Sequence, residues 1–541
     1  MKKKVLPLAV GAASAVAMTA AHAAMYVNED GTGESLILPF FSAENGNNTN
    51  VSIVNTTGNH KAVKVRILEA WNSLEVLDFN LYMSPQDHFS FAIVAEGEGA
   101  KIITNDNSCT VPAIPKPDGE PFRNLKFDKE KSAEGAAKPY DWTGLARTKV
   151  GHIEIIEMGQ LDPDYDKAGK KGVDPTGKLT AAQAITHDST GVPANCELLV
   201  KAWSNIAGVD GVWAAETSGL ATVAAKTEFM AAWTGGGLYG YANVVNVAEG
   251  SAYGYDAIAI ADQVADGKDG GVMHYQPGSV NPNFADAAFN TSSLIFNNGA
   301  VVEFNASEGY LSSTVARLQA LNATMMASAV HNDYVTDSAI SATTDWVLTF
   351  PTKRAHVTTA VPIEPFSETW DVPTASACEP TSMTLVDREE SAPPPPPAPG
   401  SSGPDFSPAP PTPPGPAPSN NDVPLCYEAT VVQFAEASAT GADDSVAIGV
   451  NAYLDATDGW ATISFDPADA DTKLGGCNKT GTGTAPTIAC ARTISDADDT
   501  ITGLPVVGFA VQKYVNGSAG GAGVLANYAA ASVHKTTVSI S

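Results

Sequence analysis

Alternation of apolar and polar residues in the segment 36–94 constrains the fold of this chain more than any other feature. Apolar side chains recur at every second position at 51–53, 63–67, 77–83 and 89–93. A period of two places one row of side chains on a core and the other in water, as in a strand of a half-exposed sheet. Turn-forming residues separate these runs at 45–48, 55–59 and 84–87. We therefore predict a mainly β fold, made of antiparallel β-sandwich domains with a few short helices.

The first 23 residues have the pattern of a signal peptide. Lysines at 2–4 precede an apolar run at 5–20, and Ala21-His22-Ala23 provides a small-x-small cleavage site. The pattern predicts export through the Sec pathway to the cell surface or the outside of the cell. Once the signal is removed, no apolar run is long enough to predict a transmembrane helix.

A proline-rich segment interrupts the rest of the chain. Fourteen of the 36 prolines lie between Pro393 and Pro418, with Gly and Ser filling much of the remainder. Such a composition favours extended polyproline II structure, either as a spacer between two domains or as a loop within one. We predict a signal peptide at 1–23, an N-terminal β-sandwich at 24–130, a central β-rich domain with helical insertions at 131–390, the Pro-rich spacer or loop at 391–424, and a C-terminal β-sandwich domain at 425–541. The N-terminal and central parts can also form one unit.

The sequence predicts short helices at 179–185, 195–205 and 313–328. In the last of them the apolar residues form a single stripe, which is typical of core packing rather than of a ligand site. Turn residues that join two apolar runs predict β-hairpins at 238–260 and 294–304.

The chain carries a net charge of −29 at pH 7, and removal of the signal lysines makes it more negative. A field of this sign repels nucleic acids and anionic lipid surfaces, so neither is an expected partner. It is compatible with bound divalent cations, and Asp162, Asp164 and Asp166 form the best candidate loop for calcium. The loop departs from an EF-hand, because Lys167 and Val173 stand where a glycine and the closing acid are required. A solvated acidic loop is therefore the alternative, and we expect no cofactor other than calcium.

Six cysteines in an exported chain predict disulfide bonds. We favour sequential pairing, with Cys109 bonded to Cys196, Cys378 to Cys426 and Cys477 to Cys490. The sequence alone leaves other connectivities open. Free thiols or a metal site are less compatible with the chain, because it has no Cys-x-x-Cys pair.

Five stretches carry a resemblance to known proteins: Tyr26-Val27-Asn28, 63–79, 151–159 (GHIEIIEMG), 344–354 (TDWVLTFPTKR) and 425–434. Together they look like an uncharacterised family of secreted proteobacterial cell-envelope or extracellular proteins, and they are spread over most of the mature chain. The resemblance implies export and residence at the cell envelope or outside the cell. It implies no activity, cofactor or catalytic residue.

The compact motifs of common hydrolases are missing from the sequence. Neither Gly-x-Ser-x-Gly nor His-Glu-x-x-His occurs. Glu154 and Glu157 could serve a glycosidase only together with a distant acid, and we interpret them as an exposed strand face. Lys353 and Arg354 near Asp345 are either a functional constellation or a salt-bridged sheet end.

These features favour a non-enzymatic structural or interaction protein of the cell surface or extracellular space, such as a layer, matrix or filament subunit. Its expected partners are other copies of itself, other cell-surface proteins or glycans. The first alternative is an adhesin or carbohydrate-binding module, with Trp71, Trp142, Trp203 or Trp213 as sugar platforms. The second is an extracellular hydrolase with scattered catalytic residues.

Overall fold

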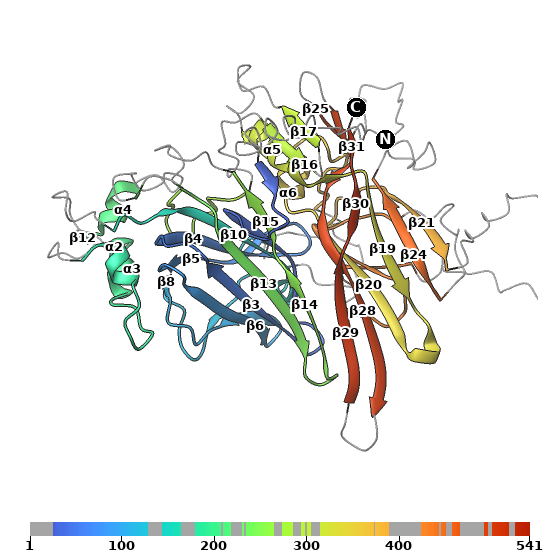
Figure 1. Ribbon diagram of the computed structural model, residues 1–541, viewed down its shortest axis with the longest axis horizontal. Coiled ribbons are helices and arrows are strands. Elements are labelled where there is room, and N and C mark those ends of the chain that lie inside the picture. The colour runs from blue at the N-terminus through green and yellow to red at the C-terminus, as the bar shows by residue number, and fades with distance from the viewer. Residues whose placement is uncertain are drawn as a thin grey trace, which may run out of the picture.

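The computed structural model describes residues 25–127, 143–163, 179–206, 209–217, 230–231, 234–263, 273–284, 294–297, 300–303, 314–372, 374–388, 423–442, 445–450, 457–465, 492–495, 500–518 and 525–540. Within these ranges the fold is mainly β, as predicted, and several antiparallel sheets are accompanied by short helices (Figure 1). The signal peptide, the proline-rich residues 393–418 and the predicted Cys477–Cys490 pair lie outside the described residues.

The largest sheet has nine strands and contains much of the segment with the strongest alternation. Its strands are, in spatial order, β17 (Ala300–Glu303), β16 (Leu294–Asn297), β1 (Met25–Val27), β15 (Ile258–Ala261), β2 (Ser35–Ser42), β10 (Val150–Gln160), β4 (Lys61–Glu69), β5 (Glu75–Met83) and β8 (Cys109–Val111). Neighbouring strands are antiparallel, except that β1 and β16 are parallel. Strand β4 thus lies inside the sheet, with β10 on one side and β5 on the other.

A six-stranded sheet faces the nine-stranded sheet. Its strands are β14 (Ser251–Asp256), β13 (Leu238–Asn246), β3 (Asn47–Asn55), β6 (His88–Glu96), β7 (Gly99–Ile103) and β9 (Glu120–Pro121). Apolar side chains from both sheets, among them Leu38, Val65 and Phe89, share one buried cluster, which we call the main core. This is the sandwich that the alternation at 36–94 predicts.

Two further sheets come mostly from the C-terminal third of the chain. The first contains β23 (Ala447–Gly449), β22 (Ala429–Gln433), β20 (Ala342–Thr349), β28 (Val507–Ser518) and β29 (Leu525–Val533). The second contains β21 (Ser382–Asp387), β24 (Asp458–Ser464), β19 (Ala329–Val335) and β30 (Lys535–Thr537). Val347 and Phe509 of the five-stranded sheet enter the main core, whereas Trp346 and Leu348 belong to a separate C-terminal core together with residues of the four-stranded sheet.

Shared sheets cross both boundaries that the sequence suggests. Strand β10 lies between β2 and β4, and β22 pairs with β20 although the Pro-rich segment separates them in sequence. On the two sides of that segment, the Val423 N–H donates to the Thr381 carbonyl at 3.0 Å, and Cys378 is bonded to Cys426. The segments that precede and follow the Pro-rich segment in sequence therefore lie next to each other in the structure.

Short helices lie beside the sheets. They are α2 (Ala181–Ile185), α3 (Glu197–Ala202), α4 (Val212–Thr217), α5 (Thr314–Met325) and α6 (Lys353–Val357), with 3-10 turns η1 (Leu145–Lys149) and η7 (Ser338–Ile340). The helices predicted at 179–185 and 313–328 are confirmed by α2 and α5. The helix predicted at 195–205 is shorter, since α3 has Cys196 as its N-cap and ends at Ala202.

Three small sheets complete the fold. They are β11 (Asn205–Ile206) with β12 (Val209–Asp210), β18 (Met326–Ala327) with β27 (Leu504–Pro505), and β25 (Thr493–Ser495) with β26 (Thr500–Thr502) and β31 (Ser539–Ile540). The predicted hairpins at 238–260 and 294–304 are present as β13–β14 and β16–β17.

The outer face of the nine-stranded sheet is covered, and here the expectation of one wet face is wrong. Helices α2, α3 and α4 lie beside β4, β5 and β8 (Figure 1), and Leu199 and Trp213 share an outer core with Ile156 of β10. The segment 273–284 covers the same face, since the Asn80 amide donates to the Tyr275 carbonyl at 2.9 Å. As a result, β4 and β10 are buried along their whole length.

Candidate functional site

Four of the five stretches singled out in the sequence meet around β4, namely 63–79, 151–159, 344–354 and 425–434. Strand β10 pairs with β4 along its length. At the end of β4, the Ala429 N–H donates to the Ala70 carbonyl at 2.9 Å, and Arg354 Nη1 donates to the Asn72 carbonyl at 3.2 Å. Segments separated by hundreds of residues in sequence therefore converge on one place, and we take it as the candidate functional site.

The outer face of β4 carries two buried cations. Side chains alternate along the strand, so that Val63, Val65 and Ile67 enter the main core while Lys64 and Arg66 point to the covered outer face. Lys64 is 0% and Arg66 is 7% exposed. Charges buried to this degree require partners, because an isolated ion in the interior is strongly unfavourable.

Carboxylates on the neighbouring strands supply these partners. Arg66 lies directly opposite Glu154 of β10 and bonds it, and its Nε lies 3.0 Å from Glu75 Oε2. Lys64 Nζ contacts Asp78 Oδ2 of β5. A bulge in the pairing of β4 with β5 brings Glu75 opposite Leu68, and thereby onto the same face as Asp78. Three strands thus contribute to one buried row of alternating charge.

Two more ion pairs lie at the ends of β4. Lys61 Nζ is 2.7 Å from Glu157 Oε1, and both side chains are fully buried. At the other end, Glu69 accepts hydrogen bonds of 2.7 and 2.9 Å from the Arg147 guanidinium. Glu69 also accepts three backbone N–H bonds, and the Arg147 guanidinium lies over the ring of Phe127 at 4.4 Å.

The environments of these acids shift their pKa values in opposite directions. Burial raises the pKa of Glu154 to about 7, because Arg66 offsets the desolvation of the carboxylate only in part. Burial acts on Glu69 in the same sense, but Arg147 and the backbone N–H groups outweigh it and hold the pKa of Glu69 below its usual value. His152, on the same strand as Glu154, is buried, and this lowers the pKa of its imidazole to about 3.

Two hollows open over the charged face. One of about 350 Å³ is lined by Arg66, Glu75 and Glu154 together with Arg354 and other residues of 351–358. The other, of about 560 Å³, lies along β5 and shares Glu75 with the first. Both hollows can admit water or a small polar ligand to groups that are otherwise buried.

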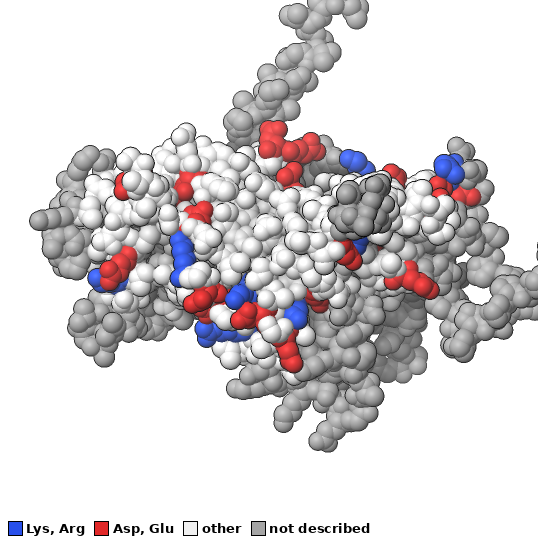
Figure 2. Space-filling view, turned by 90° about the horizontal axis from the view of Figure 1, so that it is seen from below, with Lys and Arg blue, Asp and Glu red and all other residues white. Residues whose placement is uncertain are grey.

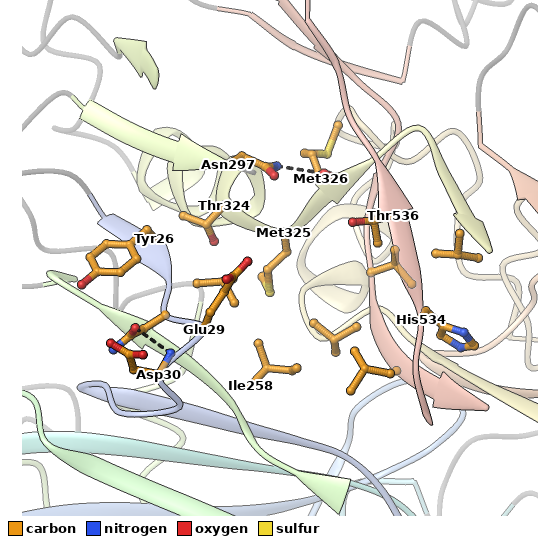
Figure 3. Close-up of a pocket in the computed structure, with 17 residues that line it drawn as sticks. Tyr26, Glu29, Asp30, Ile258, Asn297, Thr324, Met325, Met326, His534 and Thr536 are labelled. Atoms are coloured by element: carbon orange, nitrogen blue, oxygen red, sulfur yellow. Dashed lines mark hydrogen bonds between the residues drawn. The ribbon is translucent and has the colours of Figure 1, made fainter. Parts of the chain in front are cut away.

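A third pocket, of about 490 Å³, lies between β1, the end of α5 and β30 (Figure 3). Tyr26 and Asp30 lie on one side of it and His534 on the other, so these groups do not converge on one point (Figure 3). His534 is held through a 3.0 Å contact between its Nε2 and the Val347 carbonyl, and burial lowers its pKa to about 4. Asn297 donates to the Met326 carbonyl at 2.8 Å and thereby fixes the end of α5. His534 and Asn297 thus serve the packing around the pocket.

Lys353 is also buried, but the structure does not bring it to Asp345. Its Nζ donates to the Leu425 carbonyl at 2.9 Å, whereas Asp345 accepts from the Thr440 N–H at 2.8 Å. Burial lowers the pKa of Lys353 to about 8, and burial raises the pKa of the neighbouring Glu428 to about 8. The predicted constellation is thus replaced by an interaction of Lys353 with the segment after the Pro-rich region.

Several residues predicted from the sequence have other surroundings than expected. Glu154 and Glu157 are 3% and 1% exposed, so the prediction of an exposed strand face is wrong. Trp71, Trp203 and Trp213 are buried in the two cores and therefore do not offer sugar platforms. Trp142 lies outside the described residues.

Two of the three predicted disulfides are confirmed, whereas the predicted calcium loop is not tested. The structure contains the predicted disulfides Cys109–Cys196 and Cys378–Cys426. Asp162 is described, but Asp164 and Asp166 are not, so the calcium loop stays a prediction. Among the described residues, no three His, Cys, Asp or Glu side chains are grouped as metal ligands.

On one face of the molecule, charged side chains of both signs are present although the net charge of the chain is −29. On the face seen in Figure 2, acidic and basic side chains lie scattered among uncharged ones, and several lie next to each other. None of the helices in the described ranges is long and apolar enough to cross a membrane.

Comparison of the chain with protein-family models, with curated proteins and with solved structures finds no match.

Proposed function

We propose that this protein is an exported, non-enzymatic structural or interaction protein that acts at the cell surface or outside the cell, as a subunit of a layer, matrix or filament. The observation that carries the proposal is the set of ion pairs around β4. Lys61, Lys64, Arg66 and Glu69 each bond a group of opposite charge on another segment. Ion pairs arranged in this way link neighbouring segments of the fold, which is a structural role.

Links between distant segments support the same role. Cys109–Cys196 ties β8 to the start of α3, and Cys378–Cys426 joins the segments on the two sides of the Pro-rich region. The main core contains residues from both ends of the described chain, such as Leu36 and Val511. A body that is joined in this way has few segments that can unfold locally, which suits a protein outside the cell.

Electron microscopy of the purified mature protein tests the proposal. We expect negatively stained samples to contain ordered assemblies, and calcium to promote them if the acidic loop at Asp162 contributes. The matched control is the same protein after exhaustive chelation. Monodisperse single particles in both samples would contradict a layer, matrix or filament subunit.

One feature favours a second candidate, a binding module for glycans. The hollow of about 350 Å³ brings Arg66, Glu154 and Arg354 together, and guanidinium and carboxylate groups are suitable partners for sugar hydroxyls. A glycan array and calorimetry test this candidate. Binding that survives Glu120→Gln, a change outside this hollow, and is lost in Arg354→Ala would support it. An array without any bound glycan would exclude it for the glycans tested.

A further inference from the structure

We propose that Lys64 and Asp78 condense to an intramolecular isopeptide bond, which joins β4 to β5 covalently. Lys64 Nζ attacks Asp78 Cγ, a C–N bond forms, and the carboxyl C–O bond breaks. One proton from the amine and the carboxyl hydroxyl leave together as water. The step is a condensation, so it requires no oxidant, reductant or further reactant.

The first requirement is that the two groups are held in contact, and the sheet provides this. Arg66 lies opposite Asp78 and Lys64 opposite Asn80, so the Lys64 side chain extends diagonally to Asp78 and its Nζ contacts Oδ2. Strand pairing fixes both backbones, and the Gly278 N–H donates to the same Oδ2 at 2.9 Å. Two reacting groups held in this way meet at a high effective concentration.

The second requirement is that the amine is neutral when it attacks. Lys64 is fully buried and the Asp78 side chain is 9% exposed. Burial lowers the pKa of the Lys64 ammonium, although Asp78 opposes the shift. In an interior site, transfer of the proton from the ammonium to the carboxylate replaces two buried charges by two neutral groups. The same transfer converts the amine to a nucleophile and the carboxyl to a form that can lose its hydroxyl.

The third requirement is a group that moves protons between the amine and the leaving hydroxyl, and we assign this role to Glu75. The bulge opposite Ile67 and Leu68 places Glu75 on the face that carries Asp78. Burial raises the pKa of Glu75 against the opposing charge of Arg66, and the charge of Asp78 raises it further. Arg66 holds the Glu75 carboxylate with its Nε at 3.0 Å. A positioned carboxyl group of this kind is a suitable general acid and base.

The water released by the condensation can leave the site through a hollow. Asp78 and Glu75 both line the hollow of about 560 Å³ along β5, together with Gly278. Loss of water to solvent through this hollow favours the condensed product.

The pair Lys61–Glu157 provides an internal comparison. It is as deeply buried, with a distance of 2.7 Å, but the groups that bond Glu157 besides Lys61 are the Gly236 N–H and Gln160. Neither a backbone amide nor a glutamine side chain serves as a general acid and base at neutral pH. We therefore expect Lys61 to remain an amine while Lys64 is converted.

Mass spectrometry of the full, folded protein tests the proposal. After reduction and alkylation, the intact chain should be one water lighter than the mass that its sequence requires. A protease that cleaves after glutamate releases the peptides 45–69 and 76–96, with 70–75 cut out between them. We expect these two peptides to remain joined, with fragment ions that place the branch at Lys64 and Asp78. Trypsin is less suitable, because the peptides that it releases are contiguous and a missed cleavage has the same mass.

Variants separate the chemistry from the fold. Asp78→Ala should restore the full intact mass. Glu75→Gln should lower the condensed fraction at least about tenfold in a sample prepared in the same way. Glu120→Gln is the matched control, because Glu120 lines the same hollow but pairs with Arg123, and it should leave the fraction unchanged.

Peptide analysis of the wild-type protein is sufficient to test the proposal, even if a variant fails to fold. Recovery of 45–69 and 76–96 as two separate peptides would overturn the proposal. An intact chain that is one water lighter but yields separate peptides would overturn it as well, because an aspartyl succinimide elsewhere would explain that mass.

Discussion

The two faces of β4 are built in different ways. On the inner face, Val63, Val65 and Ile67 pack in the main core among apolar side chains of two sheets. On the outer face, at almost the same depth, Lys64 and Arg66 are surrounded by Asp78, Glu75 and Glu154. One strand therefore contributes apolar packing to one side of the sheet and ion pairs to the other.

The difference lies in how much each face depends on particular partners. Apolar packing is non-directional, and a core accepts other side chains of similar volume. A buried ion pair depends on both of its members, because removal of one leaves the other charged and desolvated. We therefore expect the charged face and its cover to be the more vulnerable part of the structure.

The largest effect is expected when the cover of the charged face is released. Cys109–Cys196 attaches α3 to β8, and the bond closes a loop with a sequence separation of 87. The double change Cys109→Ser and Cys196→Ser should lower the free energy of unfolding by about 4 to 5 kcal/mol in the chain-entropy model, as measured by urea denaturation.

The second disulfide is the matched control for this change. Cys378–Cys426 closes a separation of 48 and does not attach the cover. Its removal should cost about 4 kcal/mol. Hydrogen exchange should become faster in β4 and β5 when Cys109–Cys196 is lost, and remain unchanged there when Cys378–Cys426 is lost. Equal exchange in both variants would show that the helical cover does not protect the charged face.

A slightly smaller loss is expected when one member of a fully buried ion pair is removed. Arg147→Met keeps most of the side-chain volume over Phe127 but leaves the buried Glu69 without its cation. The free energy of unfolding should fall by about 3 to 5 kcal/mol. A loss below about 1 kcal/mol would mean that the three backbone N–H bonds to Glu69 are sufficient by themselves.

The pH dependence of stability distinguishes the two faces of β4, because the apolar side chains of the inner face do not titrate. The pKa of Glu154 rises from 4.5 to about 7 on folding. Between these values the folded protein binds more protons than the unfolded chain, so this group makes the protein less stable as the pH rises from about 4.5 to about 7. The contribution is at most about 3 kcal/mol.

Glu154→Gln should remove this part of the pH profile, and Ile67→Val on the inner face should not. Urea denaturation of the three proteins between pH 4.5 and 8 provides the measurement. Parallel profiles for the wild-type protein and Glu154→Gln would show that Arg66 keeps Glu154 ionised throughout.

The inner face was predictable from the sequence, and the outer face was not. Alternation at 63–67 indicates strands with an apolar row, because that pattern depends on neighbouring residues alone. The surroundings of Glu154 come from distant parts of the chain, since Phe284 and residues of 351–358 line the hollow beside it. A signal for the ion pairs was nevertheless present, since β4 carries three cations and β10 carries two acids within otherwise apolar runs.

The disulfides could also be predicted from the sequence, whereas the contacts at the candidate site could not. With six cysteines in the chain, sequential pairing is the favoured prediction, and both described disulfides follow it. The neighbours of Lys353 could not be predicted, because its hydrogen bond to Leu425 bridges the Pro-rich segment. Contacts of this kind depend on how sheets are placed in space, which local patterns do not determine.

The smallest effect is expected for an ion pair of the same chemistry at the surface. Arg123 bonds Glu120 at 2.7 Å, as Arg147 bonds Glu69, but the Arg123 side chain is 63% exposed. Water solvates both groups when the pair is broken, so Arg123→Ala should change the free energy of unfolding by at most about 1 kcal/mol. The change should vanish at high salt, which screens exposed charges, whereas the loss in Arg147→Met should persist. A large, salt-insensitive loss in Arg123→Ala would show that distance between the charges, rather than burial, decides how much an ion pair of this protein contributes.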